Sequence, residues 1–111
     1  MILAMPVLED KGRESRISMH FGHNPLFAIC DTEKKSIRMV SVGEQGEGCT
    51  PVDGIARYKP EAIFTLNIGG KAMAMLRQKG IAIKTGDFAT VGEVLDNAGR
   101  LKDLEEGCGH G

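Results

Sequence analysis

Two histidines three residues apart, His20 and His23, are the first side chains whose type and spacing suggest chemistry. Neutral imidazole is a good ligand for borderline metals, so a pair of them can form part of a metal site. Gly22 lies between them and lets the backbone turn sharply, so that both rings can face one opening. The alternative is a pair of exposed loop histidines with no function.

Two of the three cysteines stand among glycines, where a thiol can be reached. Cys49 precedes Thr50, the expected N-cap of a helix, and the positive end of that helix dipole favours the thiolate, which binds metals. Cys108 and His110 lie in a glycine-rich chain end that can close over a bound group. An idle loop thiol and a disordered chain end are the alternatives. Cys30 ends an apolar run, so we expect it in the core.

Gly69 and Gly70 follow an apolar run and begin a helical pattern. A helix start of this kind presents free backbone amides on which an anion can rest. The two glycines match neither a P-loop nor a dinucleotide-binding motif. Close packing of a strand against a helix would explain them equally well.

The composition is that of an ordinary globular domain, and we expect one domain over residues 1–111. A formal net charge of -1 gives no general attraction to polyphosphate, so we expect no nucleic acid partner. We expect no membrane partner either and a cytoplasmic location, because no apolar run is long enough to span a bilayer and the first residues lack the features of a secretory signal. Three cysteines make a disulfide framework improbable.

The elements that must position these residues fall into two halves. In the first half, apolar runs predict strands at 1–6, 26–31 and 37–42 that form an antiparallel meander. The polar stretch at 8–16 is expected to be a mobile loop.

In the second half, strands alternate with helices. Helices are predicted at about 51–58, at about 70–78 with Gly80 as its end, and after Thr90, which forms a capping box with Glu93. Strands are predicted at 62–66 and 81–83. This alternation indicates parallel pairing through right-handed crossovers. We therefore predict an α/β fold with a mixed five-stranded sheet flanked by helices, and a flexible glycine-rich tail at about 103–111.

Enzymatic functions fit the sequence poorly. A nucleophilic pair would need Cys49 beside one of the loop histidines, which spacing alone cannot show. A nuclease of the ribonuclease-H-like fold would hold metal with acids on its strands, and the first strand, residues 1–6, has none. We therefore predict no catalytic residue and no enzymatic activity.

Four stretches, taken together, resemble the dinitrogenase iron-molybdenum cofactor biosynthesis family, which includes NifX, NafY and the C-terminal part of NifB. They are Ser18-Met19-His20-Phe21-Gly22, Gly48-Cys49, Leu66-Asn67-Ile68-Gly69-Gly70 and residues 86–95. The resemblance covers nearly the whole chain. The glycine-rich Cys-Gly-His end is more similar to the small stand-alone members than to the nitrogenase accessory proteins.

The resemblance implies a ribonuclease-H-like sheet and the non-enzymatic binding or carriage of an iron-sulfur or molybdenum-containing cluster. The partners would be metallocluster donor or acceptor proteins. The implied cofactor-binding positions are His20, Phe21, Gly22, Gly69 and Gly70, and the candidate metal ligands are His20, His23, Cys49, Cys108 and His110. Two alternatives stay open: a regulatory or scaffold module that binds a protein partner without metal, and a mononuclear zinc-binding or iron-binding protein.

Overall fold

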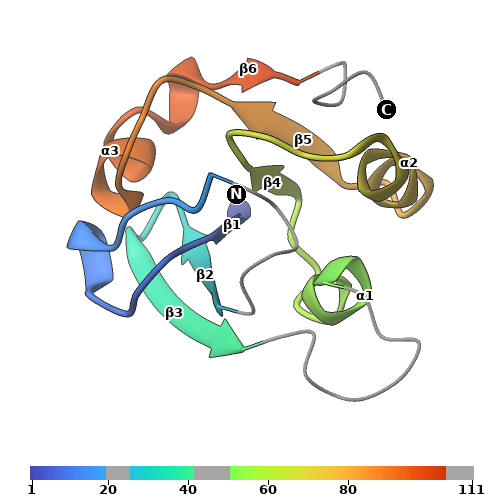
Figure 1. The fold of residues 1–111 in the computed structure, drawn as a ribbon. Coiled ribbons are helices and arrows are strands. Elements are labelled where there is room, and N and C mark those ends of the chain that lie inside the picture. Colours follow the sequence, from blue (N-terminus) through green and yellow to red (C-terminus); the bar gives the residue numbers. More distant parts are fainter. Residues whose placement is uncertain (20–25, 42–50, 105–111) are drawn as a thin grey trace.

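Strand β1, Ile2–Pro6, lies in the middle of the fold (Figure 1). The computed structural model describes residues 1–19, 26–41 and 51–104. The middle of β1 is fully buried, because the strand is paired on both sides and both faces of the sheet are covered.

Six strands form one mixed sheet in the order β3-β2-β1-β4-β5-β6. Strands β1, β4 and β5 are parallel, whereas β2 is antiparallel to both of its neighbours and β6 is antiparallel to β5. The predicted meander and the predicted parallel half are thereby confirmed. The other strands are β2 (Leu26–Asp31), β3 (Ser36–Ser41), β4 (Ala62–Phe64), β5 (Ala82–Thr85) and β6 (Lys102–Asp103).

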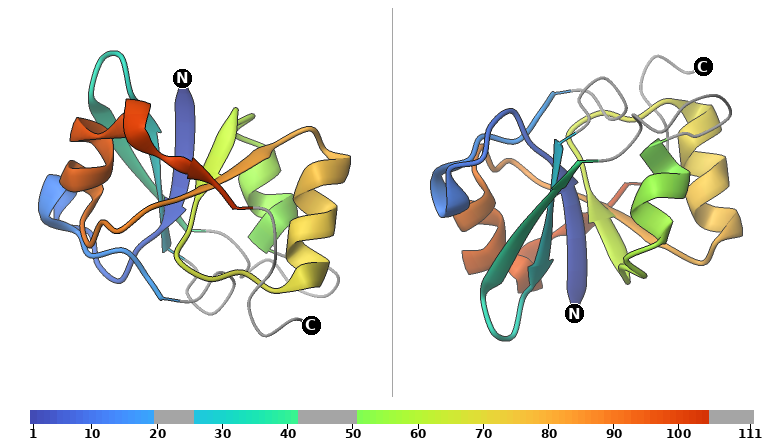
Figure 2. Two further views of the ribbon diagram at one scale, coloured as in Figure 1. Left: turned by 90° about the horizontal axis from the view of Figure 1, so that it is seen from above. Right: turned by 90° about the horizontal axis from the view of Figure 1, so that it is seen from below.

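Helices cover both faces of the sheet. In both views of Figure 2, helices α1 and α2 lie on one side and α3 on the other. Two short 3-10 turns complete the described elements, and η1 packs beside α3. The bounds are α1 (Pro51–Ala56), α2 (Gly70–Gln78), α3 (Val91–Asp96), η1 (Gly12–Glu14) and η2 (Ala98–Arg100).

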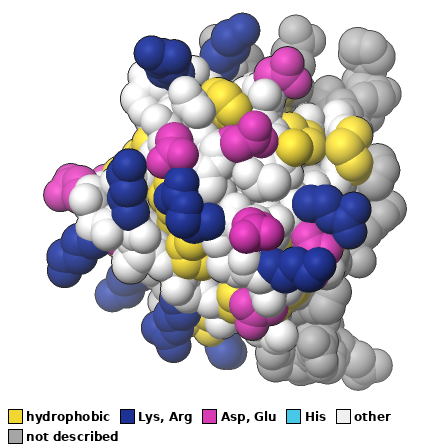
Figure 3. All heavy atoms as spheres, turned by 90° about the vertical axis from the view of Figure 1, so that its left-hand side faces the viewer, with side chains coloured by type: hydrophobic (Ala, Val, Ile, Leu, Met, Phe, Trp, Pro, Cys, Tyr) yellow, Lys and Arg dark blue, Asp and Glu magenta, His cyan; other side chains and the backbone are white. Residues whose placement is uncertain are grey.

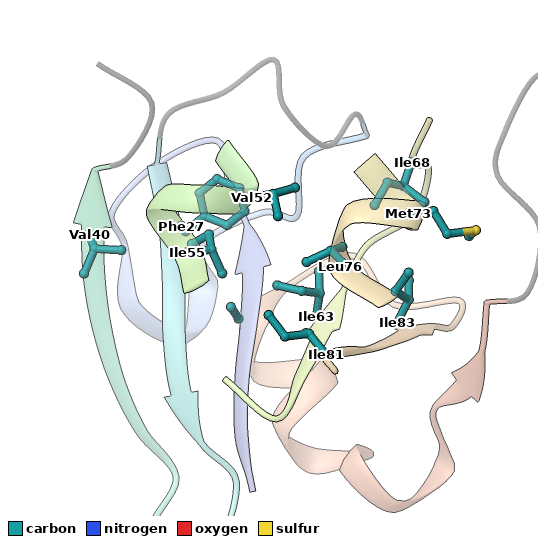
Figure 4. Packing of buried hydrophobic residues seen from close by; sticks show 11 residues of the cluster. Phe27, Val40, Val52, Ile55, Ile63, Ile68, Met73, Leu76, Ile81 and Ile83 are labelled. Carbon is teal, nitrogen blue, oxygen red and sulfur yellow. The ribbon is translucent and has the colours of Figure 1, made fainter. Parts of the chain in front are cut away.

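Each face of the sheet has its own apolar core. On the side of α1 and α2, Ile55 and Leu76 extend from the two helices toward the sheet, where they meet Phe27 and Ile63 (Figure 4). On the other side, the core of α3 includes Cys30, as predicted, with Leu3, Met5, Ala28, Phe64, Val91, Val94 and Leu95. The protein is thus a three-layer α/β structure with two buried interfaces.

Local signals at the helix ends are confirmed. The Thr90 side chain accepts a hydrogen bond from the backbone N–H of Glu93, and the Glu93 side chain accepts from the backbone of Thr90, which is a complete capping box. Gly80 ends α2 with a φ of +75°, a conformation that glycine adopts without strain.

The polar segment at residues 8–16 differs from the predicted mobile loop. The Glu9 carboxylate accepts hydrogen bonds from the backbone N–H of Arg16, at 2.6 Å, and from its guanidinium Nη2, at 3.0 Å. An isolated antiparallel bridge joins Arg16 to Thr90. The bridge to Thr90 joins residues far apart in the chain and leaves no local trace in a polar sequence, and composition alone therefore suggests a free loop.

The prediction of five strands missed β6, which pairs with the end of β5 through Thr85 and Lys102. Helix α1 ends at Ala56, two residues earlier than predicted, because the chain turns there and the backbone N–H of Tyr58 bonds the carbonyl of Ile55. Most of the predicted flexible tail, residues 105–111, lies outside the described residues.

The surface around η1 and α3 carries charges of both signs. Figure 3 shows basic and acidic side chains mixed over this face, with apolar side chains between them. Within residues 1–19, 26–41 and 51–104, no helix is long and apolar enough to cross a membrane.

We expect the protein to fold without a metal, because both cores are built from apolar side chains. Protein treated with a chelator should keep a single cooperative thermal transition, followed by circular dichroism. Loss of that transition on metal removal would show that the fold depends on a metal.

Candidate functional site

The candidate site lies where the parallel strands end. The carboxyl ends of β1, β4 and β5 share one edge of the sheet, which we call the carboxyl edge. Helices α1 and α2 both begin at this edge, because each returns the chain to the opposite edge before the next parallel strand. Open α/β sheets commonly bind ligands in this position.

The turn between β4 and α2 is held by side-chain hydrogen bonds. Thr65, which is fully buried, donates from Oγ1 to the carbonyl of Asn67 at 2.9 Å. The Asn67 side chain then donates from Nδ2 to the carbonyl of Met19 at 3.1 Å. A turn in the second half of the chain is thereby tied to a segment from the first half.

The segment that ends at Met19 is also tied to the sheet. The backbone N–H of Ser18 bonds the carbonyl of Pro6, and that of Ile17 bonds the carbonyl of Ala89, both at 2.8 Å. Upstream, hydrogen bonds from the Arg16 guanidinium and backbone lower the pKa of Glu9 from 4.5 to about 2. The chain therefore reaches the carboxyl edge in a defined position, with the side chain of Met19 exposed.

The first turn of α2 has no side-chain cap. Gly69 is its N-cap, and the first helical bond runs from the N–H of Met73 to the carbonyl of Gly69, at 3.0 Å. The start of α2 thus lacks the side-chain acceptor that Thr90 supplies to α3. A Cβ at Gly69 would meet no atom of the described residues within 4 Å. Close packing against this part of the chain therefore does not explain why a glycine stands there.

Most of the predicted site residues lie outside the described part of the chain, so their positions stay predictions. Gly69 and Gly70 are described, and both lie at the carboxyl edge, where α2 begins. Among residues 1–19, 26–41 and 51–104, no cluster of three or more His, Cys, Asp or Glu side chains could hold a metal ion. The predicted residues outside the described ranges are His20, Phe21, Gly22, His23, Cys49, Cys108 and His110.

Sequence reasoning did not single out Thr65 and Asn67. Asn67 belongs to a turn that resembles the family motif, but its partner Met19 is 48 positions away. A side chain that bonds across such a distance leaves no periodic or local signal.

The protein is therefore a small α/β protein with a mixed sheet. At the carboxyl edge of this sheet, the turn after β4 leads into a helix that has no side-chain cap. Residues 1–100 match the family described as dinitrogenase iron-molybdenum cofactor. The chain therefore belongs to that family, as its motifs predict.

Individual proteins are similar to this chain over most of its length. The chain is 28% identical to the uncharacterized protein MJ0580 of Methanocaldococcus jannaschii over 102 residues, which is 86% of this chain and 82% of the relative. The crystal structure of PH0822 is similar with a TM-score of 0.78 and 28% identity, covering 94% of this chain and 96% of that one. The apo form of the orange protein from Desulfovibrio gigas shares the fold, with a TM-score of 0.77 at 19% identity and coverage of 93% and 92%.

Cys30 should resist modification in the native protein, because its side chain is fully buried and burial raises the pKa of its thiol to about 12. We predict that Cys49 reacts faster. Native protein would be treated with a thiol reagent, and the labelled peptides followed over time by mass spectrometry. In denaturant, all three cysteines should react at similar rates. Equal native rates at Cys30 and Cys49 would remove the argument for a reactive thiolate.

Proposed function

We propose that the protein binds or carries an iron-sulfur or molybdenum-containing cluster without catalysing a reaction, and that it passes this cargo between donor and acceptor proteins. Membership of the cofactor family over residues 1–100 supports this proposal. The same kinship supports assigning the sheet to the ribonuclease-H-like type.

The start of α2 carries the proposal. Its first amides have no side-chain cap, and the neighbouring turn is hydrogen-bonded to Met19, the residue before His20. A sulfur-rich cluster is anionic, and free amides at the positive end of a helix stabilise an anion. Gly69 and Gly70 would therefore supply hydrogen bonds to the cargo, with Phe21 and Gly22 close to it.

In this proposal, imidazole and thiolate supply only one or two bonds to the metal. His20 is the principal ligand, and His23, Cys49, Cys108 and His110 are further candidates. Incomplete ligation suits a carrier, because cargo held by a full set of ligands is released slowly. No step of the proposal requires a nucleophile or a general base.

Two other functions predict different results in one assay. A mononuclear zinc or iron protein would contain metal without sulfide, and a module that binds only a protein partner would contain neither. Iron, molybdenum and acid-labile sulfide would be measured in protein purified without oxygen. A carrier should contain sulfide together with iron or molybdenum, or should take up both when a cluster is supplied.

His20→Ala should weaken cluster binding more than His110→Ala. The chain before His20 is held at Ser18 and Met19, whereas His110 lies in a glycine-rich end. Ordering such an end costs about 1 to 2 kcal/mol per residue, which offsets much of the bond it makes. We expect His20→Ala to raise the dissociation constant by about 100-fold, since even outer-shell partners of metal ligands contribute about 10- to 100-fold.

The measurement is a titration of each variant with an iron-sulfur cluster or thiomolybdate under anoxic conditions, followed by visible absorption. Both variants should show the thermal transition of the wild type. If His20→Ala binds like the wild type and His110→Ala does not, the ligand is in the chain end and the proposed site is wrong.

Gly69→Asp should stabilise the fold and weaken cargo binding. An aspartate at this N-cap would accept hydrogen bonds from the first amides of α2 and complement the helix dipole, raising the free energy of unfolding by about 0.5 kcal/mol. The same carboxylate would occupy those amides and repel an anionic cluster, which we expect to weaken binding about tenfold.

Gly99→Asp is the matched control, because a Cβ at Gly99 also meets no atom within 4 Å and Gly99 lies in η2, on the opposite face of the sheet from α2. It adds the same charge away from the carboxyl edge and should leave binding unchanged. Equal affinities of Gly69→Asp and wild type would exclude the α2 amides from the site.

A further inference from the structure

We propose that Asn67 is a positioning residue for cargo binding: its side-chain amide fixes the backbone at Met19, immediately before His20. This inference rests on the proposed function, because it assigns Asn67 a role at that same site. Asn67 would not touch the metal. It would act through the backbone of the segment that carries the ligand.

The geometry identifies Asn67 as the donor. Its Nδ2 lies 3.1 Å from the carbonyl oxygen of Met19. A carbonyl oxygen can only accept a hydrogen bond, so the amide must turn its NH₂ group toward Met19. The bond joins two segments that are 48 positions apart in the chain.

Asn67 is itself held firmly. The hydroxyl of Thr65 donates to the Asn67 carbonyl at 2.9 Å, and the backbone N–H of Thr65 bonds the carbonyl of Lys84 at 3.0 Å. Thr65 and Ile68, which flank the turn, are both buried. The Asn67 amide therefore extends from a rigid part of the structure, so the bond positions Met19 and not the reverse.

On the other side of the bond, the acceptor belongs to the last described residue before position 20. Ser18 is the last residue before Met19 whose backbone N–H bonds the sheet, through the carbonyl of Pro6. The bond from Asn67 then holds the carbonyl of Met19, one residue further along the chain. Its loss would let the chain fray from Met19 back toward Ser18, so the ligand would have to be ordered when the cargo binds.

The bond also ties two parts of the proposed site together. Asn67 lies two residues before Gly69, the uncapped start of α2. The same short turn therefore sets the position of the amides and the position of the chain before His20. A cluster that contacts both would find their separation fixed before it arrives.

Asn67→Ala is the direct test, and Asn97→Ala is its matched control. Asn97 is also half-buried, and its Nδ2 also donates to a backbone carbonyl, that of Glu93, at 2.8 Å, but it lies at the end of α3. Thr65→Val is a second test that introduces no charge. It removes the hydroxyl that bonds the Asn67 carbonyl and keeps the shape of the side chain.

Two quantities would be measured for each variant: the affinity for thiomolybdate or an iron-sulfur cluster under anoxic conditions, and the hydrogen exchange of the Ser18 amide by NMR. We expect Asn67→Ala to weaken binding by about threefold to tenfold, the range that one hydrogen bond contributes, and to speed exchange at Ser18. Thr65→Val should shift both quantities in the same direction by less. Asn97→Ala should change neither.

The inference is overturned if Asn67→Ala binds like the wild type, or if Asn97→Ala loses as much affinity, since the effect would then be one of general stability. A wild-type protein that binds neither probe would refute the proposed function, and with it any role of Asn67 toward cargo. The exchange rate at Ser18 separates the two failures, because it reports on the bond to Met19 whether or not cargo binds.

Discussion

The parallel pairing of β1 with β4 is the contact on which the rest of the structure depends. It is short, with Leu3 opposite Ala62 and Ala4 opposite Ile63, yet it joins the antiparallel half of the sheet to the parallel half. Because both strands run in the same direction, the chain leaves each of them at the carboxyl edge. In this arrangement the segment that ends at Met19 lies within hydrogen-bond distance of Asn67.

The apolar layers, and not the ion pairs, hold this arrangement together. The pairs of Asp96 with Arg13 and Lys35 join side chains that are each about half exposed, and such pairs contribute little to stability. In contrast, Phe27, Phe64 and Leu76 are completely removed from water on the two faces of the sheet. The layers of the fold are therefore held together by apolar contacts and not by these surface ion pairs.

The sequence was sufficient to predict features that depend on neighbouring residues. The capping box of Thr90, the glycine that ends α2 and the buried runs of the central strands follow from local spacing, and the structure confirms them.

Strand β6 was missed because its two residues, Lys102 and Asp103, are polar and pair only through their position beside β5. The bond from Asn67 to Met19 was missed for the same physical reason: its partners meet only after the sheet has formed. For the candidate site, the sequence indicated the start of α2, and it could not show what holds the neighbouring segment.

The two helices with described N-caps, α2 and α3, differ in how the backbone amides of their first turns are capped. At α3, Thr90 and Glu93 satisfy each other's backbone groups, so that this helix start is capped by its own side chains. At α2, Gly69 supplies no side-chain acceptor, although no atom of the described residues lies within 4 Å of the place where a Cβ would stand. The fold therefore forgoes a few tenths of a kcal/mol that an N-cap side chain would contribute. In the proposed carrier function this omission would matter, because amides that no described side chain caps could bind an anion without first breaking an internal hydrogen bond, and could release it without reforming one.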